Sequence, residues 1–159
     1  KMLTSELKEY TIKKAQNFIG SEPFMMTYGD GVSDINIKEL IKFHKTHGQA
    51  VTMSSVQPDG RFGALNVNNE NRIKEFKEKP KGDGNWINAG FFVCNSEVFD
   101  YIDSDEGVVF EEGPLQRLAQ DGKLYTYKHT GFWKPMDSLK DKNDLNKLWD
   151  GGNPPWKAW

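Results

Sequence analysis

The sequence predicts an α/β fold with a mixed, mainly parallel sheet. Short apolar runs, such as residues 24–28 and 124–129, alternate along the chain with segments of helical pattern such as 37–47. This alternation is typical of α/β proteins, whose strands are mostly parallel. Two strand-like runs flank residues 68–71 and predict a hairpin, so the sheet must also contain antiparallel pairing.

Helix signals at both ends predict a helix over 37–47, because Asn36 is a good N-cap, Glu39 follows three residues later and Gly48 is a natural stop. Ile35 and Leu40 are spaced for a hydrophobic staple across its start. Residues 1–19 also have helical character, but their apolar positions form two offset stripes. Further helices are expected at 96–102, with Asn95 as its cap, and at 114–121. A last helix is expected at 138–149, with Leu145, Leu148 and Trp149 packing inward.

The expected strands are apolar or alternating runs bounded by turn residues. The first, 24–28, ends in Gly29, Asp30 and Gly31, which places an acidic residue at the carboxyl end of a strand, where ligands bind in open α/β sheets. The other expected strands cover 50–56, 62–67, 72–79, 86–94 and 124–129.

Length and composition narrow the class of protein. The 159 residues fit one domain, 1–159, and the 21 basic against 23 acidic side chains give no basic surface for nucleic acid or a membrane. The single cysteine, Cys94, excludes an intrachain disulfide and indicates a reducing compartment. No run approaches the roughly 18 apolar residues of a membrane span. We therefore expect a soluble, cytoplasmic domain.

Three places could carry chemistry, and each also has an ordinary structural interpretation. Asp30 could hold a divalent cation or could simply form an Asx-turn. Lys79 could bind a phosphate and Glu78 sugar hydroxyls, or the alternating charges of 74–81 could mark a solvated strand face. Asp137, after an aromatic segment, could be a ligand or a residue at a helix start.

The histidines and the cysteine give weaker evidence of a catalytic or metal site. His44 and His47 lie three residues apart on an expected helix, and we interpret them as solvated side chains because no third zinc ligand is suggested by spacing. Cys94 follows an apolar strand and is expected in the core. The chain shows no hydrolytic triad pattern, no Walker A loop and no G-x-G-x-x-G turn.

Five motifs in order give the chain a specific resemblance. They read FMMTYGDGVSD (24–34), GRFGAL (60–65), FKEKPKGDG (76–84), INAGFFV (87–93) and GFWKPMD (131–137). From about Thr11 to Trp159 the chain resembles the sugar-1-phosphate nucleotidylyltransferases, and among them most closely the glucose-1-phosphate cytidylyltransferases. The co-occurrence of five motifs favours the functional interpretations over the structural ones.

The resemblance implies a Rossmann-like nucleotidyltransferase fold and the reaction of CTP with glucose 1-phosphate to CDP-glucose and pyrophosphate, in a bacterial deoxysugar pathway. By resemblance, Asp30 and Asp137 match the aspartates that hold Mg²⁺. Lys79 matches the lysine on the sugar phosphate, and Glu78 the acidic residue on the hexose. Three residues match the sugar pocket and one the nucleotide site: Gly63, Asn88 and Gly90 for the sugar, and Gly29 for the nucleotide.

One part of the family pattern is missing. The family begins with a strand and a loop of the form G-G-x-G-T-R that binds the triphosphate, whereas residues 1–10 of this sequence match nothing in it. We therefore expect an N-terminally truncated domain with exposed apolar surface that forms a homo-oligomer. Two functions stay open: an enzyme that is active when completed, and a noncatalytic module that binds a nucleotide or sugar phosphate or only oligomerises.

Overall fold

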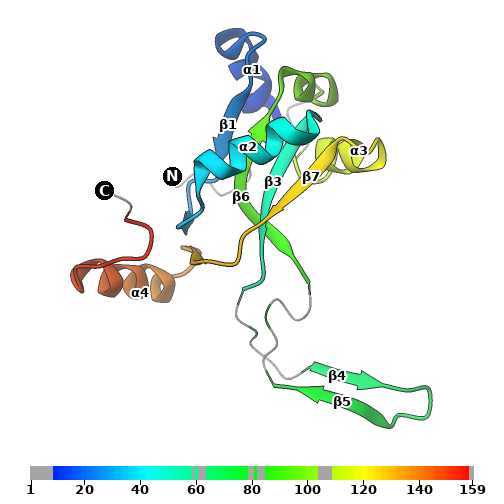
Figure 1. The fold of residues 1–159 in the computed structure, drawn as a ribbon, viewed down its shortest axis with the longest axis vertical. Helices are drawn as coiled ribbons and strands as arrows, with labels where there is room; N and C mark the ends of the chain where they lie inside the picture. Colours follow the sequence, from blue (N-terminus) through cyan, green and yellow to red (C-terminus); the bar gives the residue numbers. More distant parts are fainter. Residues whose placement is uncertain are drawn as a thin grey trace.

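A four-stranded sheet lies at the centre of the molecule, with strands in the order β1-β6-β3-β7 (Figure 1). The computed structural model describes residues 9–58, 60, 64–78, 81, 85–103 and 109–157. The sheet strands are β1 (Phe24–Thr27), β3 (Val51–Val56), β6 (Ile87–Cys94) and β7 (Leu124–Lys128). Each lies within two residues of a strand expected from the sequence.

The sheet is mixed, as predicted, but its pairings are mostly antiparallel. β6 pairs antiparallel with both β1 and β3, and β3 pairs parallel with β7. β1, β3 and β7 therefore share one direction, and β6 runs against them. The expectation of mainly parallel pairing was wrong. β6 lies between β1 and β3 and runs opposite to both, so the β1–β6 and β3–β6 ladders are antiparallel.

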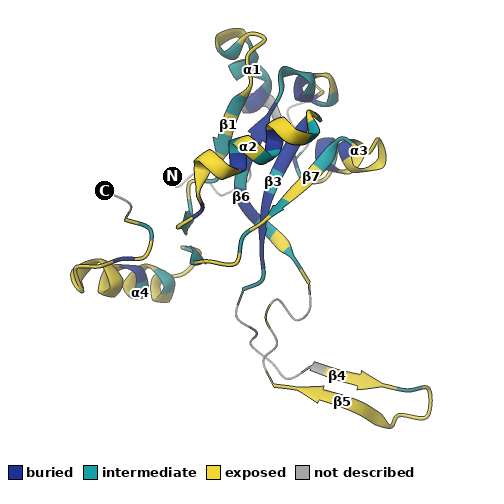
Figure 2. Cartoon of the chain, viewed as in Figure 1, coloured by how far each residue is buried: buried dark blue, intermediate teal, exposed yellow. Residues whose placement is uncertain are grey.

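Helices cover both faces of this sheet. Along β6, Phe92 and Cys94 belong to one buried cluster and Val93, between them, to another, as the alternation of a strand requires. The first cluster packs against α1 (Glu9–Ile19), the 3₁₀ helix η2 (Ser96–Tyr101) and α3 (Pro114–Gln120), and the second against α2 (Ile37–His47). The buried positions follow β3 and β6 through the centre of Figure 2.

The start and end of α2 confirm the signals read from the sequence. The Asn36 side chain accepts a hydrogen bond from the Glu39 amide at 3.2 Å, and Gly48 ends the helix in the left-handed region. Ile35 and Leu40 are both buried in the cluster under this helix. The helix is therefore specified locally at both ends and fixed to the sheet by the staple.

The interpretation of His44 and His47 as solvated side chains was wrong. His44 is 3% exposed, and its two ring nitrogens lie 2.9 Å from Thr52 Oγ1 and 3.1 Å from Asn95 Oδ1. His47 Nε2 lies 2.7 Å from the same Thr52 oxygen, and His47 Nδ1 accepts from the amide of Gln49. The histidines join α2 to the sheet because helical spacing turns both of them toward β3.

Two further expectations, the cap of the 3₁₀ helix η2 and the packing of the last helix, were also wrong. Asn95 does not cap η2 with its side chain, which instead bonds His44 and the carbonyl of Gln49. In α4 (Leu139–Asp150) Leu145 is buried, but Leu148 and Trp149 are exposed, contrary to the inward packing expected of all three. Among the described helices, none is long and apolar enough to cross a membrane.

Two small ladders lie outside the central sheet. β2 (Gly31–Ser33) pairs antiparallel with β8 (Trp133–Pro135), and neither strand was expected from the sequence. β4 (Ala64–Val67) and β5 (Ile73–Lys77) form the predicted hairpin, which we call the β4–β5 ribbon. The ribbon extends away from the sheet (Figure 1), and its described side chains are exposed from Ile73 through Lys77 (Figure 2).

Candidate functional site

The β2–β8 ladder brings two of the predicted metal ligands to one place in the chain fold. Asp30 directly precedes β2, and Asp137 follows β8 by two residues. Gly31 lies opposite Pro135, and the amide of Met136 donates a 2.7 Å hydrogen bond to the carbonyl oxygen of Asp30. Residues about one hundred positions apart in sequence therefore meet at one end of this ladder.

The donor set at this end fits a magnesium ion. Mg²⁺ prefers oxygen ligands and is commonly held by one or two carboxylates, with water and substrate phosphates completing its shell. Asp30 is half-buried and Asp137 is exposed, so both can reach solvent and a ligand. Within the described ranges no group of three or more metal-ligating side chains occurs. Two aspartates can supply only part of such a shell, so the metal role of Asp30 and Asp137 stays a prediction.

Tyr28 connects this end of β1 with two other segments. Its amide donates to the carbonyl of Gly90 at 2.9 Å, and Asn88 Nδ2 donates to its hydroxyl oxygen at 3.1 Å. The hydroxyl in turn donates to Glu111 Oε1. Burial raises the pKa of Tyr28 well above its usual value, and the Glu111 carboxylate and the charge of Asp30 raise it further. Tyr28 therefore stays a hydrogen-bond donor at any physiological pH.

Gly90 has a packing role in this arrangement. It is buried with φ of +81°, and a Cβ placed there would lie 2.9 Å from Cδ2 of the Tyr28 ring. Its amide also donates to Asn88 Oδ1 at 2.8 Å, which orients the Asn88 side chain. The roles of Asn88 and Gly90 in substrate binding stay predictions, but the structure places both residues against Tyr28.

Glu111 is a candidate that the sequence reasoning missed. Its Oε2 atom is buried and has no hydrogen-bond partner among the described residues. A buried acceptor without a partner is costly, and a ligand hydroxyl or water would satisfy it. The available signal was an acidic pair, Glu111 and Glu112, directly after the apolar run that ends in Phe110.

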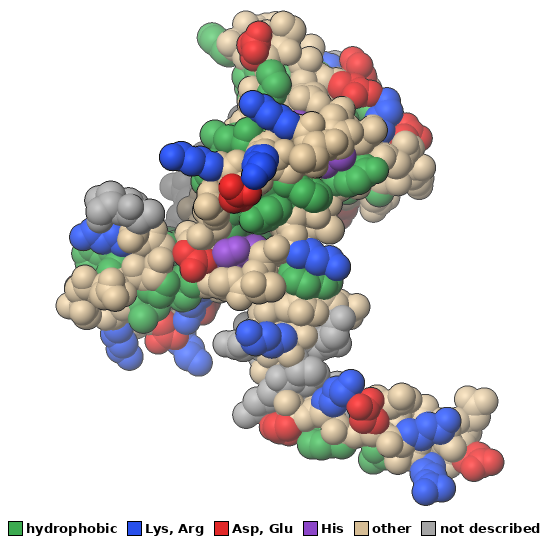
Figure 3. All heavy atoms as spheres, viewed as in Figure 1, with side chains coloured by type: hydrophobic (Ala, Val, Ile, Leu, Met, Phe, Trp, Pro, Cys, Tyr) green, Lys and Arg blue, Asp and Glu red, His purple; other side chains and the backbone are tan. Residues whose placement is uncertain are grey.

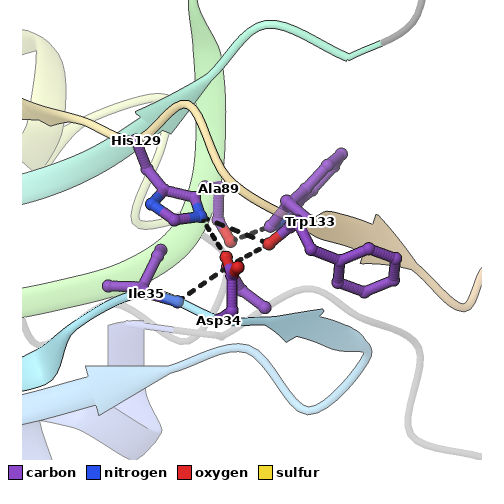
Figure 4. Close-up of polar contacts among 7 residues, drawn as sticks. Asp34, Ile35, Ala89, His129 and Trp133 are labelled. Carbon is purple, nitrogen blue, oxygen red and sulfur yellow. Dashed lines mark hydrogen bonds and ion pairs between the residues drawn. The ribbon is translucent and has the colours of Figure 1, made fainter. Parts of the chain in front are cut away.

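Several contacts hold β8 and the segment before it in position (Figure 4). Trp133 Nε1 donates to the carbonyl of Ala89 at 2.9 Å, which ties β8 to β6. His129 Nε2 lies 2.7 Å from Asp34 Oδ1, and the Asp34 amide donates to the carbonyl of Phe132. Asp137 is therefore anchored through the aromatic segment that precedes it.

Of the other predicted site residues, Gly29 directly precedes Asp30 at the β2–β8 end, whereas Glu78 lies elsewhere in the described structure. Gly29 is exposed, with open space where a Cβ would lie, so a ligand can approach its backbone. Glu78 is exposed just beyond β5, on the ribbon that extends away from the sheet (Figure 1). Lys79 and Gly63 lie outside the described residues.

A cavity of about 360 Å³ is lined in part by residues of β8. Its lining includes Trp86, His129, Trp133 and Lys134, and none of the predicted site residues that the structure describes contributes to it. The aspartate pair and the Tyr28 contacts therefore locate the candidate site, whereas this cavity does not.

The chain matches a family model described as Nucleotidyl transferase over residues 10–147. It is 48% identical over 149 residues to "Glucose-1-phosphate cytidylyltransferase" of Salmonella typhimurium, covering 93% of this chain and 57% of that protein. It is 43% identical to "Probable glucose-1-phosphate cytidylyltransferase" of Bacillus subtilis, covering 93% of this chain and 58% of that protein. The chain thus spans little more than half the length of these relatives.

Solved structures share the fold at low sequence identity. A putative glucose-1-phosphate thymidylyltransferase from Bacillus anthracis in complex with a sucrose superposes with a TM-score of 0.64 and 19% identity, covering 91% of this chain and 61% of that chain. HddC from Yersinia pseudotuberculosis gives a TM-score of 0.59 at 16% identity, with 94% and 64% coverage. The α/β fold of the nucleotidyltransferases predicted from the sequence is therefore confirmed.

Proposed function

Because this chain belongs to the nucleotidyl transferase family, we propose that it carries the sugar-phosphate side of a site that transfers a cytidylyl group from CTP to glucose 1-phosphate. The observation that carries the proposal is the 2.7 Å hydrogen bond between Met136 and Asp30, which brings the segments of both aspartates together. The names and identities of the Salmonella and Bacillus relatives support the choice of cytidine and glucose.

The proposed reaction is one in-line displacement at phosphorus. A phosphate oxygen of glucose 1-phosphate attacks the α-phosphorus of CTP and forms the new O–P bond. The bond from that phosphorus to the bridging oxygen breaks, and pyrophosphate leaves with the electron pair. Such a transfer needs positioning and charge neutralisation more than covalent help from the protein. The absence of a triad pattern in the sequence agrees with this chemistry.

The proposed roles follow from the kinds of side chain involved. Asp30 and Asp137 would hold Mg²⁺, and the bound ion would offset the charge of the reacting phosphates. Lys79 would bind the sugar phosphate and Glu78 the hexose hydroxyls. Asn88, whose amide is oriented by Tyr28 and Gly90, would donate to a sugar hydroxyl.

We also place this protein in the cytoplasm. Cys94 is a free, buried thiol, and burial raises its pKa to about 12, so it is an unreactive core residue. A single unpaired cysteine agrees with a reducing compartment.

Pyrophosphate release tests the proposal directly. If the nucleotide side of the site is completed, the 159-residue chain releases pyrophosphate with CTP, glucose 1-phosphate and Mg²⁺, and we then expect Asp30→Asn and Asp137→Asn each to lower the rate at least about a hundredfold. Asp100→Asn is the matched control, because Asp100 is an exposed carboxylate in η2. Equal rates in all four proteins would contradict the proposed metal role.

Calorimetric titration with glucose 1-phosphate separates turnover from binding. If the chain binds the sugar phosphate with Mg²⁺ present, loses this binding in both aspartate variants and releases no pyrophosphate, the noncatalytic binding module is the correct function. If it neither binds nor turns over either ligand, the proposed function is wrong for this chain.

A further inference from the structure

The cavity that β8 helps to line is formed by segments that lie far apart in the sequence. Its volume of about 360 Å³ is at the lower end of the range of about 300–1,000 Å³ that is usual for small-ligand pockets. One wall comes from residues 56–58, at the end of β3, and another from Lys81 and Trp86, before β6. The run 129–134, which leads into β8, and Leu148 of α4 complete the described lining.

Aromatic rings in this lining are held in place by contacts of their own. Trp133 Nε1 donates to the carbonyl of Ala89 at 2.9 Å. Lys128 Nζ lies 5.2 Å from the centroid of the Trp86 ring, a cation–π contact. Phe132 adds a further ring to the lining. Because rings that are already fixed lose little freedom when a ligand binds, the cavity suits a flat, apolar group.

The charged side chains of the lining favour an anion. None of the described lining residues is acidic, whereas Lys81, His129 and Lys134 are basic. Lys134 is paired with Asp144 at 2.9 Å, but Lys81 is exposed and has no ion-pair partner among the described residues. Figure 3 shows basic side chains at the junction between the central sheet and the β4–β5 ribbon. A lysine ammonium at such a place can bind a phosphate as a point charge.

His129 supplies a polar atom of the other kind. Its Nε2 lies 2.7 Å from Asp34 Oδ1 and 3.3 Å from the carbonyl oxygen of Phe132 (Figure 4). Both partners are acceptors, so Nε2 carries the hydrogen, and Nδ1 of the neutral ring is an acceptor. The Gln57 amide also lines the cavity. The cavity can therefore both donate to and accept from the polar edge of a base or a ribose.

We propose that this cavity is a second ligand site and that it binds a nucleoside monophosphate. The base stacks on the indole of Trp86, and the ammonium of Lys81 binds the phosphate. Aromatic side chains can stack on any base, because every base has a π face. The site is independent of the proposed cytidylyl transfer, since it uses neither Asp30 nor Asp137.

Simpler ligands fit the same lining less well. A free sugar would need acceptors for its hydroxyl groups, and the described lining contains no carboxylate. Inorganic phosphate would use the charge of Lys81 but would leave the aromatic rings in contact with water. Only a ligand that joins a planar ring to a phosphate uses both parts of the cavity.

Calorimetric titration of the 159-residue chain with AMP, in a buffer that contains EDTA, tests this site. EDTA removes divalent ions and so suppresses metal-dependent binding at the aspartate pair. We expect Trp86→Ala and Lys81→Ala each to weaken AMP binding about tenfold or more, as the usual strength of base stacking and of a phosphate contact implies. Trp149→Ala and Lys38→Ala are matched controls, because both side chains are exposed and lie outside the lining. Both should bind AMP like the original chain.

Further titrations separate the two parts of the ligand. Adenosine and inorganic phosphate should each bind about tenfold or more weakly than AMP, since each makes only some of the contacts. Trp86→Phe keeps an aromatic ring and should retain most of the affinity, which shows that a loss in Trp86→Ala is not a folding defect. In ¹H–¹⁵N spectra, AMP should shift the indole signals of Trp86 and Trp133 and leave that of Trp149 in place.

Four results would overturn the proposal. A chain that does not bind AMP at millimolar concentration has no such site. AMP binding that survives both cavity substitutions but is lost in Asp30→Asn belongs to the aspartate pair. Phosphate that binds as tightly as AMP shows that the rings are not used. Displacement of AMP by glucose 1-phosphate makes the cavity part of the proposed transfer site. A failure of the pyrophosphate assay alone would leave all of these titrations interpretable.

Discussion

Gly90 is the glycine at which we expect an added methyl group, as in alanine, to destabilise the fold most. A Cβ at this buried position would lie 2.9 Å from the Tyr28 ring, and φ of +81° is unfavourable for any side chain. We expect Gly90→Ala to lower the free energy of unfolding by about 2–4 kcal/mol. Urea denaturation followed by tryptophan fluorescence measures this loss.

Gly122→Ala is the control that separates strain from contact. Gly122 has φ of +69° and open space where a Cβ would lie. Gly122→Ala should therefore lower the free energy of unfolding by about 1 kcal/mol, from backbone strain alone. If Gly90→Ala costs no more than Gly122→Ala, the ring of Tyr28 moves freely, and the packed arrangement of Tyr28, Asn88 and Gly90 is not rigid.

Residue-level prediction succeeded where the determinant is local. Asn36 and Glu39 are three residues apart, so their capping contact is visible in the sequence and is confirmed. Asn95 resembles a cap equally well, yet its amide bonds His44, which lies 51 positions away. Glu111 was missed for the same reason, since its partner Tyr28 is 83 positions away.

The contact between α2 and β3 should make stability depend on pH. Gln49 donates to His47 Nδ1, so Nε2 of the neutral ring carries the hydrogen that bonds Thr52. Burial, and then the neighbouring His44, lower the pKa of His47 below its usual 6.5. The unfolded chain therefore takes up a proton more readily than the folded one. We expect the urea midpoint to be constant above this pH and to fall as the pH drops below 6.5.

His47→Gln is the comparison that assigns this effect. The variant loses the titrating ring, so its urea midpoint should change less between pH 7.5 and 5.5 than that of the original chain. The depressed pKa values of Asp141 and Asp144 act near pH 4 and below, outside this window. Parallel curves for the two proteins would assign the pH dependence to other groups.

At the scale of elements, the sequence predicted the strands and helices that have local signals such as caps, turn residues and apolar periodicity. It did not predict β2 and β8. Each of these strands has three residues, too few for a period to show. They exist because Gly31–Ser33 pairs with Trp133–Pro135, which no local pattern reveals. The candidate site depends on this ladder, so a joint role of Asp30 and Asp137 could be predicted only through the family resemblance.

At the scale of the whole molecule, the buried core and the β4–β5 ribbon are separate. The two buried clusters draw on the helices and on the four-stranded sheet, and none of their members lies in β4 or β5. The sequence predicted the hairpin but placed it within a single compact sheet. Its charged and apolar residues alternate in the same way whether the strand joins a sheet or extends from it.

Removing the ribbon tests this separation. Ala64 pairs with Lys77, so a two-residue Asn-Gly turn in place of residues 65–76 can join them. Because the core clusters contain no ribbon residue, the thermal midpoint should change by less than about 2 °C and near-ultraviolet circular dichroism should be kept. Loss of cooperative unfolding would show instead that the ribbon supports the core.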